Sequence, residues 1–178
     1  MSMSKMNWPA IAFALLAVAA GPAVCSAQTE KKPDPTLREV LLAQWTDIGE
    51  KVVKLAEEFP EDKYDFRPVP EVRTFADQLR HVAFWNLFVQ KTARGEKIDP
   101  AQNELSKAEY PTKAKIVAAL KSTLADATAE LKKEAESPAA RRARLWITFT
   151  EHSGEHYGQL VVYYRLNGIV PPASRSGN

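Results

Sequence analysis

The chain is poor in the residues that build thiol-based sites. Its 178 residues include one cysteine and three histidines. A single thiol excludes a disulfide framework, a zinc ribbon and a thiolate cluster, which leaves imidazole and carboxylate as the strong metal-binding groups. The sequence also has no phosphate-cradling glycine loop and no nucleophile elbow, so no motif identifies a small-molecule substrate.

The chain also has no large excess of positive or negative side chains. The chain has 24 Lys and Arg residues against 22 Asp and Glu residues, and no basic tract. A surface of this kind gives no large positive field, so we expect no nucleic-acid partner. Hydrophobic residues make up 45% and charged residues 26% of the chain, which is typical of one ordinary globular domain.

The longest apolar run is too short to span a bilayer as a helix. It extends from Ala10 to Ala20, follows a single Lys5, and ends at Gly21 and Pro22. A membrane-spanning helix needs about 20 apolar residues. The pattern is instead typical of a secretory signal peptide.

Small side chains at Cys25 and Ala27 predict signal cleavage after Ala27. Residues 1–27 are then the signal, and residues 28–178 form an exported domain, periplasmic or extracellular, with no stable membrane insertion. The alternatives are an uncleaved signal that anchors the chain and a lipid attached to Cys25. The residues before Cys25 match a lipidation signal poorly.

Apolar residues recur at intervals of three and four in four segments of the mature chain, which is the period of an amphipathic helix. The predicted helices cover about 35–59, 74–94, 112–137 and 142–167. We therefore predict an all-α protein, a four-helix bundle. In the second helix Phe84, Leu87 and Phe88 lie outside the main stripe, so that helix should be buried on more than one side. Asp77 is expected to cap its start, together with Thr74.

All three histidines fall in two of these helices. His152 and His156 are four residues apart, so their rings lie on one face, one turn from each other. That face also carries Leu145, Phe149, Leu160 and Tyr163, so we expect the pair to point into the bundle. His81 lies in the second helix, and it can join them if the second and fourth helices are neighbours or lie diagonally. The alternative is three core histidines satisfied by hydrogen bonds, without a metal.

Three neutral imidazoles leave a divalent ion with its full charge and an open position, as in a catalytic zinc site. The predicted ligands are therefore His81, His152 and His156, with zinc or nickel as the metal. An iron oxygenase triad would need a carboxylate in the set. No residue is assigned as the catalytic base. Glu155 and Gln159 are candidates to orient a ligand or water, and Trp85, Phe149 and Tyr163 are candidates to line the cavity.

Gly154 and Gly158 form a pair on the helix face opposite the two histidines. Glycine inside a helix costs about 1 kcal/mol relative to alanine, so the pair indicates close approach of another helix. A homodimer is one explanation. A contact with the first or third helix of the same chain is the other.

Three segments of the sequence, which include the histidines, resemble those of a known family. The segment 79–83 reads LRHVA, 151–160 reads EHSGEHYGQL, and 165–172 reads RLNGIVPP. They look like the corresponding segments of the DinB-like superfamily of four-helix metalloproteins, over essentially all of the mature chain. The resemblance implies that His81, His152 and His156 bind a divalent metal, often nickel or zinc, and that homodimers are common. It also implies thiol S-transferase or isomerase activity in some members.

Two functional hypotheses follow. In the first, the protein is an exported metal-dependent hydrolase or thiol S-transferase that uses the open coordination position. Export separates the chain from cytosolic thiols, so hydrolysis is the simpler reaction. In the second, it is a non-catalytic metal-binding or stress-related protein.

Overall fold

The computed structural model describes residues 33–175, which contain four long helices and no strand. The helices are α1 (Leu37–Glu58), α2 (Phe75–Ala93), α3 (Lys113–Leu131) and α4 (Ala140–Leu166). Three short 3-10 turns are η1 (Glu61–Lys63), η2 (Pro100–Gln102) and η3 (Pro172–Ser174). The predicted all-α four-helix class is confirmed. The predicted signal, 1–27, lies outside the described residues.

Capping residues fix where the helices begin. Thr36 forms a full capping box with Glu39 at the start of α1. At the start of α2 the Thr74 hydroxyl accepts from the Asp77 backbone N–H, and it donates to the Asp77 carboxylate at 2.6 Å. Asp77 therefore supports the cap through the Thr74 side chain, and not through the Thr74 backbone as a reciprocal capping box would.

The third helix is shorter than predicted. It ends at Leu131, although the apolar period and the first proline had placed its end near 137. The chain turns before that proline because the backbone N–H groups of Lys133 and Glu134 bond carbonyls three residues back. Glu134 is buried there by Arg142 and Trp146 of α4. A tertiary contact thus ends α3 early, and no local signal predicts it.

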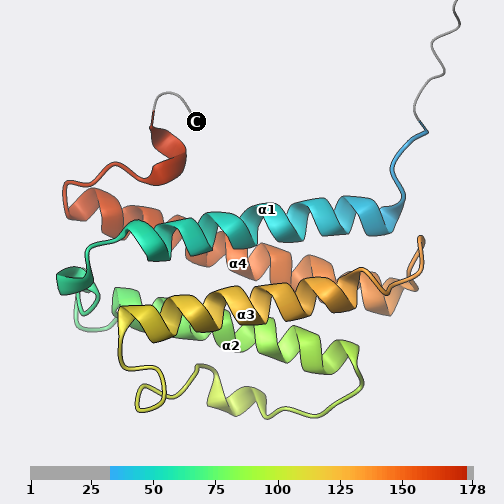
Figure 1. Cartoon of the computed structure of the whole chain (residues 1–178), viewed down its shortest axis with the longest axis horizontal. Helices are drawn as coiled ribbons and strands as arrows, with labels where there is room; N and C mark the ends of the chain where they lie inside the picture. Colours follow the sequence, from blue (N-terminus) through green and yellow to red (C-terminus); the bar gives the residue numbers. More distant parts are fainter. Residues whose placement is uncertain (1–32, 176–178) are drawn as a thin grey trace, which may run out of the picture. The chain divides into compact units, whose positions relative to one another are not determined.

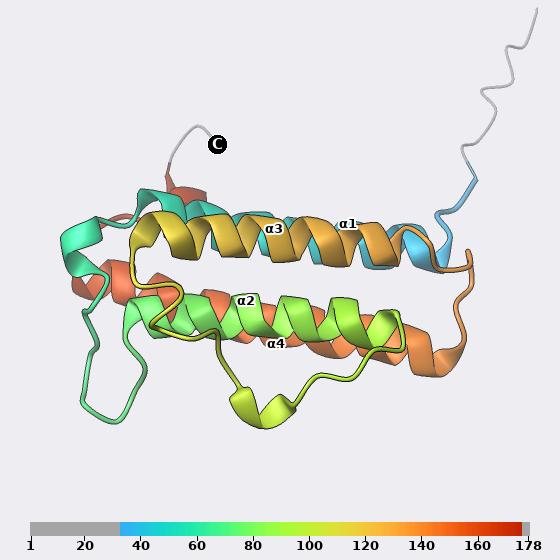
Figure 2. The same cartoon turned by 60° about the horizontal axis from the view of Figure 1, so that its bottom comes forward.

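The helices form two layers, with α1 and α3 in one and α2 and α4 in the other (Figures 1 and 2). Around the bundle, α1 packs on α3, α3 on α2, α2 on α4, and α4 on α1. Helices α2 and α3 run in the same direction, so the connection from 94 to 112 must return along the bundle (Figure 1). This order makes α2 and α4 direct neighbours.

The core has two clusters, one toward each end of the bundle. Trp45 and Trp146 meet edge to face at 5.5 Å in one cluster. Phe59 stacks on Phe75 at 3.9 Å in the other. In the described residues no helix is both long enough and apolar enough to cross a membrane.

Two faces of α2 are buried, as predicted. Leu79 and Val82 belong to the bundle core, and Phe84 is 1% exposed. On the outer side the connection from 94 to 112 runs along the helix (Figure 2), and the Leu105 backbone N–H donates to the Arg80 carbonyl. On its outer side α2 therefore contacts a loop as well as neighbouring helices.

Glycines mark one close helix approach, but not the predicted one. A Cβ at Gly49 of α1 would lie 2.3 Å from a Leu124 methyl of α3. At Gly154 and Gly158 a Cβ would have no neighbour within 4 Å among residues 33–175. The intrachain explanation for this glycine pair is therefore wrong, and the α4 face that carries it is open.

Candidate metal centre

The neighbouring helices α2 and α4 bring the three histidines together. His81 comes from α2, and His152 and His156 come from successive turns of α4. One ring nitrogen of each lies within 4.8 Å of the other two. His81 and His156 are buried, whereas His152 is half-buried. The prediction that the pair on α4 points inward holds fully for His156. The ring of His152 also faces the other two rings and its Nδ1 is buried, but this residue lies on the seam between the two helices and is only half-buried.

The spacing of the three rings suits a metal ion. Nε2 of His152 is 3.1 Å from Nε2 of His81 and 3.1 Å from Nε2 of His156. Nitrogens bound to zinc at about 2.0–2.1 Å lie roughly 3.0 Å apart at a right angle and about 3.4 Å apart at the tetrahedral angle. Both observed separations fall between these values.

Hydrogen bonds on the far side of two rings fix their tautomers. Nδ1 of His81 donates to the backbone carbonyl of Asn103 at 2.5 Å. Nδ1 of His156 donates to the side-chain oxygen of Gln78 at 2.8 Å and to that of Gln159 at 3.2 Å. Because these partners are acceptors, each Nδ1 carries the proton and each Nε2 presents a lone pair.

Lone pairs that converge at 3.1 Å repel one another unless a proton or a cation lies between them. The single N–H of a neutral His152 can lie in only one of the two gaps at a time. An additional proton is disfavoured. Burial, with help from the positive charge of Arg73, lowers the pKa of His81 to about 4. Burial and the two neighbouring imidazoles lower the pKa of His152 to about 3. The rings are therefore neutral at pH 7, which is the state that binds a metal, so the residues present fit a divalent ion.

The carbonyl that orients His81 depends on an unusual backbone conformation. Asn103 ends the short η2 turn with a φ of 56°, in the left-handed region. Asparagine tolerates this region better than most residues. The long connection between α2 and α3 thereby becomes part of the site, and no sequence motif indicated it.

Gln78 also escaped the sequence analysis. It lies three residues before His81, is 5% exposed, and donates from Nε2 to the Gln159 oxygen at 2.8 Å. The two glutamines are thus bonded to each other, and the side-chain oxygen of each accepts from Nδ1 of His156. The available signal was a polar residue one turn from His81 on a mostly apolar helix, and spacing alone did not show its partner.

An aromatic group surrounds His152. The rings of Trp85 and Phe149 stack at 5.3 Å, and their centroids lie 5.7 and 6.0 Å from the His152 ring. Nδ1 of His152 and Nε1 of Trp85 are buried without a hydrogen-bond partner in the described part of the chain. Two predicted lining residues thus lie beside the cluster, on its least buried side.

The other candidates lie in different positions. Gln159 contacts His156, as described above, whereas Glu155 is exposed and its carboxylate makes no hydrogen bond among residues 33–175. Tyr163 packs on Phe66 and Phe75, and its hydroxyl donates to the Arg73 carbonyl at 2.6 Å. Tyr163 therefore lies away from the rings that surround His152.

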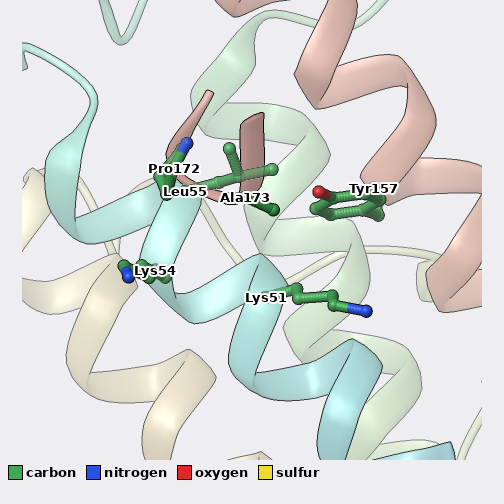
Figure 3. A pocket seen from close by; sticks show the side chains of 6 residues that line it. All are labelled: Lys51, Lys54, Leu55, Tyr157, Pro172 and Ala173. Carbon is green, nitrogen blue, oxygen red and sulfur yellow. The ribbon is translucent and has the colours of Figure 1, made fainter. Parts of the chain in front are cut away.

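Two cavities are lined in part by α4, and only the larger of them shares residues with the site. One of about 720 Å³ is lined by Arg73, Gln78, Gln159 and Tyr163, among others, and so lies on the Nδ1 side of His156. Another, of about 300 Å³, lies between α1, α4 and η3 (Figure 3). Lys51 in the second cavity is already held by Asp47 at 2.6 Å. Neither cavity is lined by a histidine, so the coordination chemistry belongs to the helix seam.

The fold and the site together define a four-helix protein with a three-histidine cluster on neighbouring helices. The sequence pattern of the DinB superfamily matches residues 44–163, which cover α2, α3, about two thirds of α1 and nearly all of α4. The chain therefore belongs to the DinB superfamily, as the sequence resemblance implied. No curated protein gives a significant match.

Proposed function

We propose that the protein binds one divalent transition-metal ion, zinc or nickel, through Nε2 of His81, His152 and His156. The observation that carries this proposal is the convergence of the ring nitrogens, with two of the rings held in the required tautomer. Neutral imidazole is a good ligand for both ions. Three ligands leave a position open for a further ligand.

A divalent ion held there would supply Lewis acidity, which favours ionisation of a coordinated water or thiol. The chain's own residues orient the ligands. Asn103 fixes the ring of His81, and Gln78 with Gln159 fixes the ring of His156. Trp85 and Phe149 limit water beside His152. These roles support a metal-dependent hydrolase or a thiol S-transferase, and we favour hydrolysis because the proposed export separates the protein from cytosolic thiols.

The second candidate is a non-catalytic metal-binding or stress-related protein. It is supported by Glu155, the acidic candidate beside the histidines, because its side chain is exposed and makes no hydrogen bond to them within the described chain. Its charge acts on His156 only to raise the pKa of that ring. Turnover of model esters by the zinc-loaded protein, lost in His152→Ala, would favour the enzyme. Unchanged background hydrolysis with stoichiometric metal would favour the second candidate.

Elemental analysis of the purified protein tests the metal site itself. We expect about one ion per chain in the wild type and almost none in His152→Ala. Glu155→Ala is the matched control on the same helix and should keep its metal. Equal trace amounts in the wild type and in His152→Ala would contradict the proposal.

Two further features are proposed with it. We infer export, from the signal-like segment 1–27, and homodimer formation through the open face around Gly154 and Gly158. The dimer is supported by the open space around both positions, since no atom of the described part of the chain lies within 4 Å of a Cβ built there. N-terminal sequencing of the exported protein would test cleavage after Ala27.

A further inference from the structure

A second site lies at the other end of the seam between α2 and α4. A cavity of about 640 Å³ is formed by the last turn of α2 and the first turns of α4. Its volume is within the range of about 300–1,000 Å³ that small-molecule sites occupy. Four arginines line it, together with the apolar side chains of Leu145 and Phe149, and they are Arg94, Arg141, Arg142 and Arg144.

Two of the four arginines are already neutralised. Arg94 pairs with Glu130 at 2.8 Å. Arg142 pairs with Glu134, and it also donates to the Ala93 carbonyl. The two glutamates are held in turn by further donors, Lys133 and Trp146. Glu130 and Glu134 are therefore committed to these partners.

Arg141 and Arg144 differ from Arg94 and Arg142. Both are exposed, and neither guanidinium group has a hydrogen bond or an ion pair within residues 33–175. They are three residues apart on α4, so they lie on one face of the helix. Two unpaired guanidinium groups on the wall of one cavity form a natural partner for a carboxylate, phosphate or sulfonate group.

The apolar part of the cavity leads toward the histidines. Phe149 lines the cavity, and its ring stacks on Trp85 and lies 6.0 Å from the ring of His152. Phe88 lies 5.4 Å from Phe149 and is also half-buried. One end of the cavity is thus cationic. The other end is aromatic and adjoins the histidine cluster.

We propose that this cavity binds a small amphipathic anion, with its acidic group on Arg141 and Arg144 and its aliphatic or aromatic body along Leu145 and Phe149. The proposal concerns a site apart from the metal centre and does not require a metal. A ligand bound in this way places its apolar end beside the aromatic group around His152.

The test is calorimetric titration of the metal-free protein with decanoate, decanol and acetate. Decanoate should saturate one site, whereas decanol lacks the charge and acetate lacks the body, so each should bind at least roughly tenfold more weakly. Arg141→Gln and Arg144→Gln should each weaken decanoate binding roughly fivefold. Arg165→Gln removes an exposed charge from the far end of the same helix and should change nothing.

Three results would overturn the proposal. The first is that decanoate shows no saturable binding. The second is that decanol binds as tightly as decanoate. The third is that Arg141→Gln and Arg144→Gln bind decanoate as tightly as Arg165→Gln does. Repeating the titration with zinc separates this site from the metal centre. If decanoate binds the zinc-loaded protein alone and His152→Ala abolishes binding, the carboxylate binds the metal and the arginine site is rejected. If the wild type binds decanoate but binds no zinc, the metal centre is rejected and the arginine site is kept.

Discussion

The side-chain oxygen of Gln78 accepts a hydrogen bond from Nδ1 of His156 at 2.8 Å, which joins α2 to α4 behind the histidine cluster. Gln78 is buried and also bonds Gln159, so its amide has a defined orientation. A residue in this position fixes the ring that a metal would need, because it holds the proton on the nitrogen opposite Nε2.

Loss of this hydrogen bond should weaken metal binding without removing a ligand. We expect Gln78→Ala to lower zinc affinity about 10- to 100-fold, measured by competition with a chelator. Gln78→Glu keeps an acceptor and should recover most of the affinity. Gln44→Ala, at an exposed position of α1, is the control. If Gln78→Ala binds zinc as tightly as this control does, Gln78 does not position His156.

Stability of the metal-free protein should fall as pH is lowered from 7 toward 4. The pKa values of His81 and His152 are about 4 and about 3 in the folded chain, against an ordinary value of about 6.5. Between these values the unfolded chain binds more protons than the folded one, so acid favours unfolding.

Urea denaturation at pH 7 and pH 4.5 measures this effect. Because carboxylates such as Asp77 also lose their pairing in acid, the comparison needs His152→Gln, which cannot take up that proton. The variant should lose less stability between the two pH values than the wild type does. An equal loss in both proteins would show that His152 does not titrate differently on unfolding.

The ion pair between Asp77 and Arg80 should stabilise the start of α2. Arg80 is 1% exposed, and its second donor reaches the Tyr110 carbonyl. Burial raises the pKa of Asp77, but hydrogen bonds from Thr74 and Arg80 outweigh it and lower the pKa overall. Asp77→Asn leaves a buried guanidinium without its anion and should cost about 1–3 kcal/mol of unfolding free energy.

The exposed pair of Asp47 and Lys51 provides the control for this substitution. Its side chains are 58% and 42% exposed, so Asp47→Asn should cost less than about 1 kcal/mol. The benefit of Asp77 requires its charge, so it should disappear as pH falls through the lowered pKa of Asp77. Equal costs for the two substitutions at pH 7 would contradict the role given to Arg80.

The proposed dimer should depend on the open glycine face of α4. Sedimentation of the wild type should give twice the mass of one chain at micromolar concentration. Gly158→Arg places a large charged side chain where the partner helix would approach, and it should give single chains. Gly158→Ala should gain up to about 1 kcal/mol in helix propensity and leave the mass unchanged. A wild type that sediments as single chains would reject the dimer.

Local sequence determined the helices and the shared face of His152 and His156, because a period of 3.6 residues acts over neighbouring turns. It also placed His81 on a second helix, and the family pattern indicated that the three belong together. Boundaries set by side-chain caps, as at Thr74 and Thr112, were predictable within a residue or two. The end of α3 was not predictable, because the chain turns there so that the Glu134 carboxylate can accept from Arg142 and Trp146 of another helix.

Only the tertiary structure decided which groups meet across helices. The order of packing made α2 and α4 neighbours and placed His152 on their seam. It also brought the Asn103 carbonyl and the Gln78 amide to the histidine rings, and left Arg141 and Arg144 beside a cavity without an anion from the described chain. These contacts join residues that are far apart in sequence, so their geometry depends on how the whole bundle packs and not on the period of any one helix.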